Sequence, residues 1–494
     1  MLHGFTRNFQ ALEILSPENV EAVHRATLDV LKETGIRFES PWALDFFEKN
    51  GCMVDREPMR VRFPEYIVEE CLRTAPGSFR LKARNPEKDV RIGGNALYFT
   101  CSCGMNTLDL ETLEPRPPTK QEHIDLIRVL DSLENCHWLI AYPYFGYAGV
   151  PPVMSITEGM AIEALHSTKH QMTAYSMDCE IFTIQIAQAL GMEVIGALSA
   201  SPPLCWSEGA VQHARRMIDA GFALGIINGA VYGGSGPATH AGSLVTGNAE
   251  LISMLIFIQL LRPGHRTAVN NFSHVMNMRS GSPAFSEIGA SLVQVMFNQM
   301  WRHYDVPAGD GGGAMPTSKS MDFQTGYEKA ISATLGALSG GSVVVLHGAV
   351  SSELAMHPLQ AILDDDIAGM VGRFIEGELI SPETLAIDLI QQVGPVPGHF
   401  LNTEHTRKWW RQQEFIPKAA ERMSYPEWIA CGKKKAIDHA REIMADILAH
   451  HEVDPPVTAQ QEQDVEKILH EAREFYRKKG MITHSEWEAY KKVW

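Results

Sequence analysis

Residues 306–350 read VPAGDGGGAMPTSKSMDFQTGYEKAISATLGALSGGSVVVLHGAV, and this stretch decides the fold. A short apolar run leads into three consecutive glycines, Gly311, Gly312 and Gly313. A polar loop and a helical segment follow, and a second apolar run ends at His347. This order predicts a strand, a loop, a helix and a strand, with polar residues at the carboxyl ends of both strands. In α/β barrels, chemistry takes place at those ends, although three glycines can also form a plain turn.

The same alternation of expected helices and strands extends over the centre of the chain. The expected helices cover residues 119–133, 156–166, 179–192, 207–221, 242–261, 283–302 and 322–337. The expected strands cover residues 138–145, 170–175, 203–206, 224–232, 266–272, 306–310 and 343–347, with an eighth strand placed at residues 96–101. Seven repeats with short connections favour a parallel barrel over an open sheet. Polar residues recur directly after the strands, which predicts one shared pocket.

The chain therefore divides into three parts. Residues 1–118 form an N-terminal extension of helices and strands that packs on the barrel. Residues 119–385 form the main barrel, and residues 386–494 form a C-terminal segment and a helical tail. The predicted fold class is an (α/β)8 TIM-type barrel with helical additions at both ends.

Composition limits the classes of partner. The 494 residues carry a net charge of −16, which argues against nucleic acid or an anionic membrane as the main partner. Residues 251–261 are the most apolar stretch and reach about half of a membrane span, so we expect a buried helix there. The eight cysteines show no paired C-x-x-C spacing. We expect a reduced, cytoplasmic protein with no membrane span.

Two clusters of chemically active side chains have alternative interpretations. Cys101 and Cys103 lie on one face of a strand, and their spacing favours reduced core or pocket thiols over a zinc pair. The acidic run Asp364, Asp365 and Asp366 is expected to open a helix, where carboxylates are favoured, with a metal site as the alternative. We expect this chain to bind no metal.

Four motifs together resemble a known family. They are LKETGIRF at 31–38, AGDGGGAMPTSKSMDFQTGYEK at 308–329, LDDDIAGM at 363–370 and GHFLNTEHT at 398–406. The chain is similar to the trimethylamine methyltransferase (MttB-like) superfamily from about residue 10 to 450. The resemblance implies an (α/β)8 barrel and methyl transfer to a cognate corrinoid protein. It also implies that the corrinoid (cobalamin) belongs to this partner, so that no cofactor is bound in this chain.

One departure from the family pattern bears on the substrate. The trimethylamine enzymes of the superfamily carry pyrrolysine inside the barrel, whereas this sequence has ordinary residues throughout. A tertiary amine must be made quaternary before it can lose a methyl group, because otherwise an amide anion would have to leave. A quaternary amine leaves neutral and needs only positioning and desolvation. The resemblance therefore favours a quaternary amine, most of all glycine betaine, with dimethylglycine as the product.

Candidate site residues follow from this substrate. Aromatic faces hold a trimethylammonium group by cation–π contact, and aromatic residues near the expected strand ends are Tyr98, Phe99, Tyr142, Tyr144, Phe145, Trp206, Tyr232 and Phe272. The alternative is that most of them pack in the core. Candidate donors to a substrate carboxylate are the N–H groups of the three glycines and the side chains of Asn228, Asn271, His274, Arg279 and Arg302, although Arg302 follows a helix and is expected to be structural. His347 and Asp310 are the candidate catalytic residues; for His347 the alternative is a hydrogen-bonded core histidine.

Two other functions compete with methyl transfer. A metal-dependent barrel lyase or hydrolase would use Asp310, Glu208 and His347. A non-catalytic protein would bind trimethylammonium compounds without turnover. A further expectation is a homo-oligomer, because Trp409, Trp410 and the charged tail are typical of partner surfaces.

Overall fold

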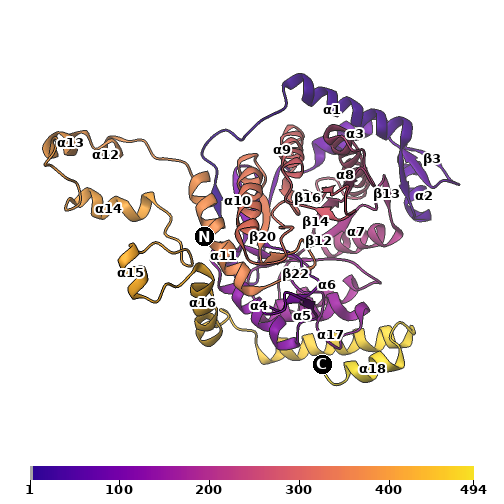
Figure 1. Cartoon of the computed structure of the whole chain (residues 1–494). Coiled ribbons are helices and arrows are strands. Elements are labelled where there is room, and N and C mark those ends of the chain that lie inside the picture. Colours follow the sequence, from indigo (N-terminus) through magenta and orange to yellow (C-terminus); the bar gives the residue numbers. More distant parts are fainter. Residues whose placement is uncertain (1–3) are drawn as a thin grey trace.

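Eight parallel strands form a closed barrel at the centre of the computed structural model, which describes residues 4–494 (Figure 1). In order around the barrel they are β7 (Ala96–Cys101), β10 (Trp138–Leu139), β11 (His170–Thr173), β12 (Val194–Ser199), β14 (Ala223–Asn228), β16 (Thr267–Asn271), β19 (Ala308–Asp310) and β20 (Val343–His347). Pairing of β20 with β7 closes the barrel. The predicted fold class and the placement of the eighth strand are confirmed, and the barrel takes this strand from within residues 1–118.

A helix follows each strand and packs outside the barrel. These helices are α4 (Lys120–Ser132), α5 (Ser155–His166), α6 (Glu180–Ala189), α7 (Glu208–Ala220), α8 (His240–Leu261), α9 (Ile288–His303), α10 (Phe323–Leu338) and α11 (Pro358–Ile375). Local sequence sets several of their starts. Thr119 and Glu122 form a capping box on α4, and the Asp322 side chain accepts the Thr325 N–H at 3.1 Å to begin α10.

The strand expected at residues 203–206 is wrong. The fourth barrel strand is β12, whereas Cys205–Trp206 forms β13 in an outer sheet beside β2 (Ile36–Phe38). A Cβ on Gly196 of β12 would lie 2.7 Å from Met217 and 2.8 Å from His213 of α7. Where α7 packs this closely, β12 has the small residues Gly196 and Ala197 in the middle of its apolar run VIGALS.

The N-terminal part covers one side and one end of the barrel. It contains β1 (Phe5–Thr6), α1 (Pro17–Asp29), α2 (Pro41–Lys49), β3 (Met53–Asp55), β4 (Arg60–Arg62), α3 (Glu65–Thr74), β5 (Ser78–Leu81) and β6 (Val90–Gly93). The β5–β6 hairpin packs its buried residues against the barrel residues Tyr98, Trp138 and Val343. This hairpin therefore closes the amino-terminal end of the barrel, opposite the end where polar loops gather.

The helix α8 is the most apolar part of the core. Among the described helices it alone is long and apolar enough to cross a membrane, and 78% of the qualifying window is buried inside the protein. It packs against α1, α3 and β14. The expectation of a buried helix at residues 251–261 is confirmed.

The acidic run of α11 does not open the helix as expected. The helix begins at Pro358, and His357 caps it by accepting the Leu359 N–H at 3.1 Å. The three aspartates are buried in the helix interior, where each binds another segment. Asp364 lies 2.9 Å from the Lys329 ammonium, and Asp366 accepts backbone N–H groups from residues 418–420. The run therefore joins three parts of the fold.

The C-terminal part has two contrasting halves (Figure 1). Helices α12 (Pro382–Leu385), α13 (Ile387–Val393), α14 (Glu404–Gln413) and α15 (Tyr425–Ala430) form an arm that projects from the barrel and buries none of its helical residues. Helices α16 (Ala436–His450), α17 (Ala459–Lys478) and α18 (His484–Tyr490) pack on the body. The buried Arg473 of α17 lies 2.8 Å from Glu158 of α5, which fixes the tail to the barrel.

Candidate functional site

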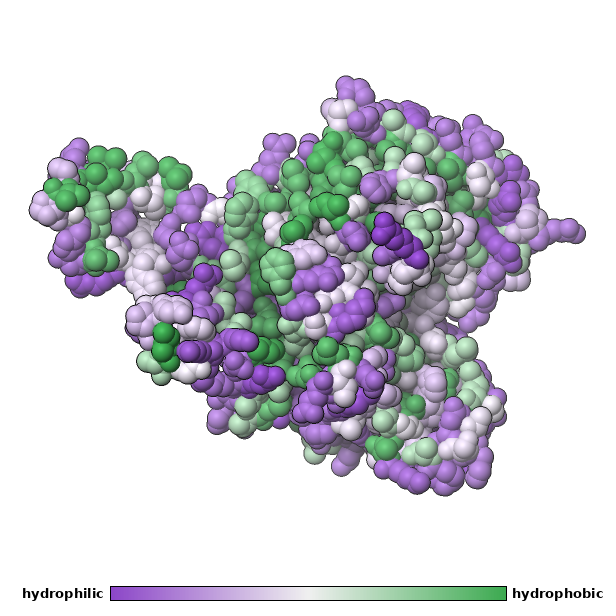
Figure 2. Space-filling view, in the orientation of Figure 1, coloured by the Kyte–Doolittle hydropathy of each residue, from purple (hydrophilic) through white to green (hydrophobic). Residues whose placement is uncertain are grey.

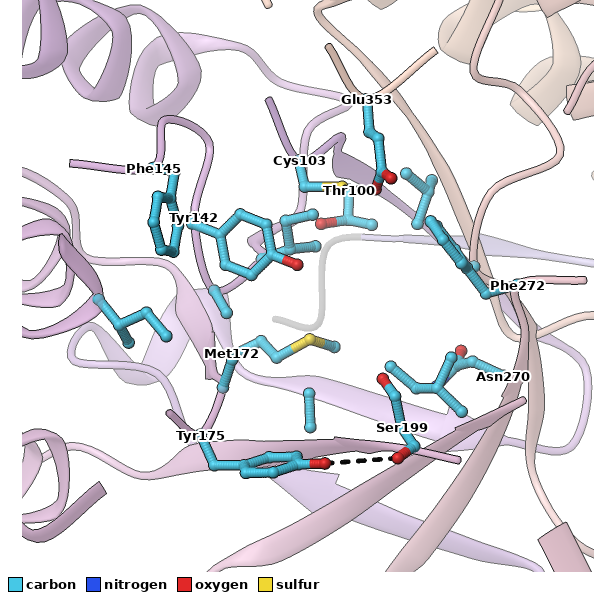
Figure 3. A pocket seen from close by; sticks show the side chains of 18 of the residues that line it. Thr100, Cys103, Tyr142, Phe145, Met172, Tyr175, Ser199, Asn270, Phe272 and Glu353 are labelled. Atoms are coloured by element: carbon cyan, nitrogen blue, oxygen red, sulfur yellow. Dashed lines mark hydrogen bonds between the residues drawn. The ribbon is translucent and has the colours of Figure 1, made fainter. Parts of the chain in front are cut away.

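A cavity of about 470 Å³ occupies the carboxyl-terminal half of the barrel (Figure 3). Its floor and sides come from strand residues such as Thr100, Ala197 and Val345, and its rim comes from the loops that follow the strands. Met105 and Ser176 on the rim are at least partly exposed. The cavity therefore reaches the surface at the mouth, defined here as the carboxyl-terminal end of the barrel strands.

Aromatic and sulfur-bearing side chains form much of the wall. They are Met105, Trp138, Tyr142, Phe145, Met172, Tyr175 and Phe272. The rings of Tyr142 and Phe145 meet edge to face, with their centroids 5.8 Å apart. Such a wall excludes water and presents ring faces, which is the chemistry that binds a methylated ammonium group.

Glu353 supplies the only ionisable carboxylate of this wall. Its carboxylate accepts a hydrogen bond from the Cys103 thiol at 3.8 Å, and burial raises its pKa. Burial and the Glu353 charge also raise the pKa of the Cys103 thiol. The pKa of Tyr142 is raised by Cys103, by burial and by Glu353. Thiol and phenol therefore stay neutral at neutral pH, and Glu353 is the acidic group of the site.

Four predicted site residues line the cavity. They are the aromatic residues Tyr142, Phe145 and Phe272 and the first glycine of the loop after β19, Gly311. The three aromatic residues come from two different loops, after β10 and after β16. Their contact with a substrate stays a prediction.

Five other aromatic candidates do not line the cavity: Tyr144 and Tyr232 are buried outside its lining, and the remaining three lie elsewhere. Tyr98 points into the closed end of the barrel, where its hydroxyl accepts the Arg91 N–H at 3.1 Å. Phe99, the next residue on β7, points outward into the cluster formed with α10 and α11. Trp206 is fully buried outside the barrel and donates its indole N–H to the Glu250 carbonyl at 3.1 Å. The structure therefore does not bring these three to the cavity.

His347 also points away from the cavity. Val343 and Val345 of β20 line it, so strict alternation would turn His347 inward as well. A register irregularity between Val345 and His347 breaks the alternation. The His347 ring is fully buried, and its Nε2 lies 3.4 Å from Asp365 of α11. This placement corresponds to the core-histidine alternative.

Asp310 shapes the glycine-rich loop. Its Oδ1 accepts the N–H groups of Gly312 at 3.1 Å and Gly313 at 2.6 Å. Burial raises its pKa to about 6, against the lowering effect of these two hydrogen bonds. Neither Gly312 nor Gly313 lines the cavity. The carboxyl group therefore fixes the turn, and the structure does not place it where it could reach a substrate in the cavity.

None of the five predicted side-chain donors lines the cavity, and Asn228 and His274 are engaged elsewhere. The Asn228 side chain accepts the Phe272 N–H at 3.0 Å and lies against Gly247 of α8. The His274 ring lies 3.1 Å from the Phe272 carbonyl and packs 4.1 Å from the Phe285 ring, centroid to centroid. Both residues hold the loop that presents Phe272, and neither lines the cavity.

Sequence reasoning missed most of the polar lining. Glu353, Cys103, Thr100, Tyr175, Ser199 and Asn270 were not candidates for substrate contact, yet all line the cavity. Ser199 belongs to the strand that the sequence pattern did not reveal. Glu353 lies six positions after His347, in a loop whose path the sequence pattern does not show. Cys101 and Cys103 were expected as core or pocket thiols on one strand face, but Cys103 lies beyond the end of β7, and it lines the cavity whereas Cys101 does not.

The metal-dependent alternative finds no support in the side-chain arrangement. Across residues 4–494, no group of three or more His, Cys, Asp and Glu side chains could hold a metal ion. Its candidate ligands are dispersed: Asp310 binds the glycine-rich loop, His347 faces α11, and Glu208 begins α7.

Residues 1–474 match the family model described as trimethylamine methyltransferase (MTTB). The chain belongs to this family of methyltransferases. It is 30% identical over 464 residues to a glycine betaine methyltransferase of Desulfitobacterium hafniense (strain Y51), covering 90% of this chain and 95% of that protein. It is 27% identical over 467 residues to trimethylamine methyltransferase MttB of Methanosarcina thermophila, covering 90% and 94%. The resemblance seen in the motifs is confirmed.

The fold of this methyltransferase also matches a solved structure. The monomethylamine methyltransferase MtmB of Methanosarcina barkeri aligns with a TM-score of 0.53 at 10% identity, over 88% of this chain and 89% of that one. At this identity the match bears on the fold alone, and it agrees with the closed eight-stranded barrel.

Proposed function

We propose that this family member transfers a methyl group from a quaternary amine to the Co(I) of a corrinoid carried by a partner protein. The observation that carries the proposal is the cavity at the barrel mouth, with ring faces on several sides and one carboxylate. That combination suits a cation that cannot donate hydrogen bonds. Glycine betaine, the substrate named for the 30% identical relative, is the first compound to consider.

The proposed reaction is a displacement that the cavity can promote by positioning. The bond between nitrogen and a methyl carbon breaks with its electron pair kept by nitrogen, and the product leaves as a neutral tertiary amine. The methyl group is accepted by Co(I), which supplies both electrons of the new bond. The protein's contribution is to desolvate the ammonium head, hold it on the rings of Tyr142, Phe145 and Phe272, and direct one methyl group to the mouth.

The mouth offers a surface for a protein that brings the corrinoid. Large apolar side chains are exposed on four of its loops and at the start of α10: Met105, Met177, Met278, Leu354 and Phe323, with exposed fractions of 41% to 86%. Exposed apolar residues around a functional opening are typical of a partner surface. Because the cavity reaches solvent between these loops, docking there would bring a cofactor held by the partner close to a bound methyl group.

We also propose that the projecting arm joins copies of this chain. Figure 2 shows apolar side chains gathered on the arm of α12–α14. Ile380, Ile387, Val396 and Leu401 are 52% to 92% exposed. Light scattering at micromolar concentration tests this proposal, and a monomeric mass would contradict it.

Methyl transfer can be tested with purified protein, cob(I)alamin kept reduced by Ti(III) citrate, and saturating amines. We expect methylcobalamin absorbance to grow with at least one of tetramethylammonium, choline and glycine betaine. Trimethylamine and dimethylglycine should react about five- to a hundredfold more slowly, because burying the unpaired N–H of their protonated forms costs about 1–3 kcal/mol. Equal rates with trimethylamine, or no transfer from any quaternary amine, would contradict the proposal.

A further inference from the structure

The cavity lining contains an acidic side chain but no basic one. Of its 22 lining residues, Glu353 is the only Asp or Glu, and the lining includes no Lys, Arg or His. We infer that the cavity takes quaternary amines with a net positive charge, with a hydroxyl or alkyl group where glycine betaine has its carboxylate, and that Glu353 is the counter-ion that selects them. The inference rests on the proposed function and narrows its substrate class.

The backbone places Glu353 at considerable cost. The two preceding residues, Ser351 and Ser352, both adopt left-handed conformations, with φ of 59° and 60°. Such conformations cost a non-glycine residue free energy and persist where the surrounding structure holds them. Here the Ser351 N–H donates to the Ser318 carbonyl at 2.7 Å, and the Met105 N–H donates to the Glu353 carbonyl at 3.0 Å. Two neighbouring loops therefore fix the position of the carboxylate.

The backbone donors that a substrate carboxylate could have used are already occupied. Of the three glycine N–H groups after β19, that of Gly311 donates to the Asn271 carbonyl at 2.9 Å. Those of Gly312 and Gly313 donate to Asp310. The glycine-rich loop is thus internally satisfied and offers an anion no free backbone donor from these three residues.

The side of the cavity away from Glu353 is polar but neutral. Figure 3 shows Glu353 beside Cys103 on one side and Ser199 with Tyr175 on the other. The Tyr175 hydroxyl donates to the Ser199 carbonyl at 3.4 Å. The Asn270 amide lies between Gly225 and Gly309, which have no side chains to displace it. Hydroxyl and amide groups of this kind can bind a substrate hydroxyl.

The two substrate classes differ in how much lost hydration and charge repulsion the cavity must offset. A substrate carboxylate would lose its hydration without gaining a cationic partner, and it would share the cavity with a second negative charge. A substrate with a hydroxyl or alkyl group has only the ammonium charge, which Glu353 attracts in a poorly hydrated environment. The difference acts on binding and therefore appears before any methyl transfer.

The test compares three trimethyl compounds by isothermal titration calorimetry with the full-length protein at neutral pH. They are choline, glycine betaine and 3,3-dimethyl-1-butanol, the uncharged isostere of choline. We expect choline to bind at least tenfold more tightly than glycine betaine and at least tenfold more tightly than the isostere. Tetramethylammonium should also bind more tightly than glycine betaine.

A matched pair of variants assigns the preference to one carboxylate. Glu353→Gln keeps the shape of the side chain and should weaken choline at least tenfold while leaving the isostere unchanged. Glu111→Gln, which removes an exposed charge outside the cavity lining, should change neither. Thermal melting verifies that both variants are folded, and the wild-type comparison of choline with its isostere needs no variant.

The outcomes separate this inference from the proposed function. If glycine betaine binds as tightly as choline or more tightly, or if Glu353→Gln leaves choline binding unchanged, the inference is overturned and the methyltransferase proposal stands. If no quaternary amine binds and none yields methylcobalamin, the proposed function fails and the inference fails with it.

Discussion

Two neighbouring loops at the barrel mouth differ in how their polar groups are used. Residues 311–322 after β19 are rich in glycine and polar side chains, but these groups bind one another: Glu328 accepts from Thr317 at 2.6 and 2.8 Å, and Ser318 donates to Asp322 at 3.0 Å. Residues 348–357 after β20 contain no such glycine-rich motif, yet they place the Glu353 carboxylate at the cavity. A conspicuous motif can therefore be structural, whereas an inconspicuous loop carries the charge.

The largest expected effect comes from removing a buried ion pair that supports both loops. Lys329 of α10 and Asp364 of α11 form a fully buried ion pair at 2.9 Å, and Asp364 also accepts the Gly348 N–H at 2.8 Å. Lys329→Met leaves this carboxylate buried without a cation, which should lower the free energy of unfolding by about 3–5 kcal/mol. Urea unfolding measures the change. The exposed Lys319→Met serves as the control, and a loss below about 1 kcal/mol for Lys329→Met would contradict the structure.

The next effect tests the structural role of the glycine-rich loop. Burial raises the pKa of Asp310 to about 6, above its unfolded value near 4, so the folded protein disfavours the ionised form. Wild-type stability should therefore fall as pH rises from about 4 to beyond 6, by about 3 kcal/mol from this group. In Asp310→Asn this contribution is absent, so the stability of the variant relative to wild type should increase over the same window.

Substrate affinity gives the second readout for Asp310→Asn. Because Asp310 does not line the cavity, choline affinity should change less than about twofold, about 0.4 kcal/mol. A large loss of affinity or of methyl transfer, with the fold intact, would return Asp310 to the catalytic role that the sequence pattern suggested.

The third effect is the pH dependence of choline affinity, which tests the charge that the loop after β20 places at the cavity. Burial raises the pKa of Glu353, and the groups that face it, Cys103 and Tyr142, have raised pKa values and stay neutral. Cation binding needs the ionised carboxylate, so choline affinity should fall as pH is lowered through this raised pKa, by up to about tenfold per pH unit. Glu353→Gln should show no such dependence. A wild-type affinity that does not change between pH 8 and pH 4.5 would contradict the role of the carboxylate.

The smallest effect concerns a single ring of the cavity wall. Phe145→Leu removes one aromatic face and should weaken choline by about 0.5–2 kcal/mol. Phe323→Leu, at an 86% exposed position on the rim, is the matched control and should leave binding unchanged. Equal effects of the two substitutions would show that the Phe145 ring does not contact the ammonium group.

The barrel could be predicted from sequence because its signal is repeated. Alternating helices and apolar runs located seven of the eight strands. The remaining one, β12, was missed because small residues such as Gly196, where α7 packs closely, interrupt its short apolar run VIGALS. Periodicity depends on local chemistry, so it fails where a neighbouring helix determines which residues fit.

The site could be predicted only in part, for two geometric reasons. Aromatic residues just after strands, such as Tyr142 and Phe272, were correctly expected near the cavity because loop starts follow the strands. Residues within strands depend on alternation, and one irregularity turned His347 outward. Glu353 depends on two left-handed serines and on contacts with other loops, none of which a single sequence displays.

The most direct test of the account is a crystal structure of the protein with choline bound. The account predicts an ammonium group within about 6 Å of the Tyr142 and Phe145 ring centroids, with the Glu353 carboxylate as its nearest charged group. A choline molecule bound against Gly312 and Gly313, with its charge turned away from Glu353, would contradict it and return the site to the glycine-rich loop.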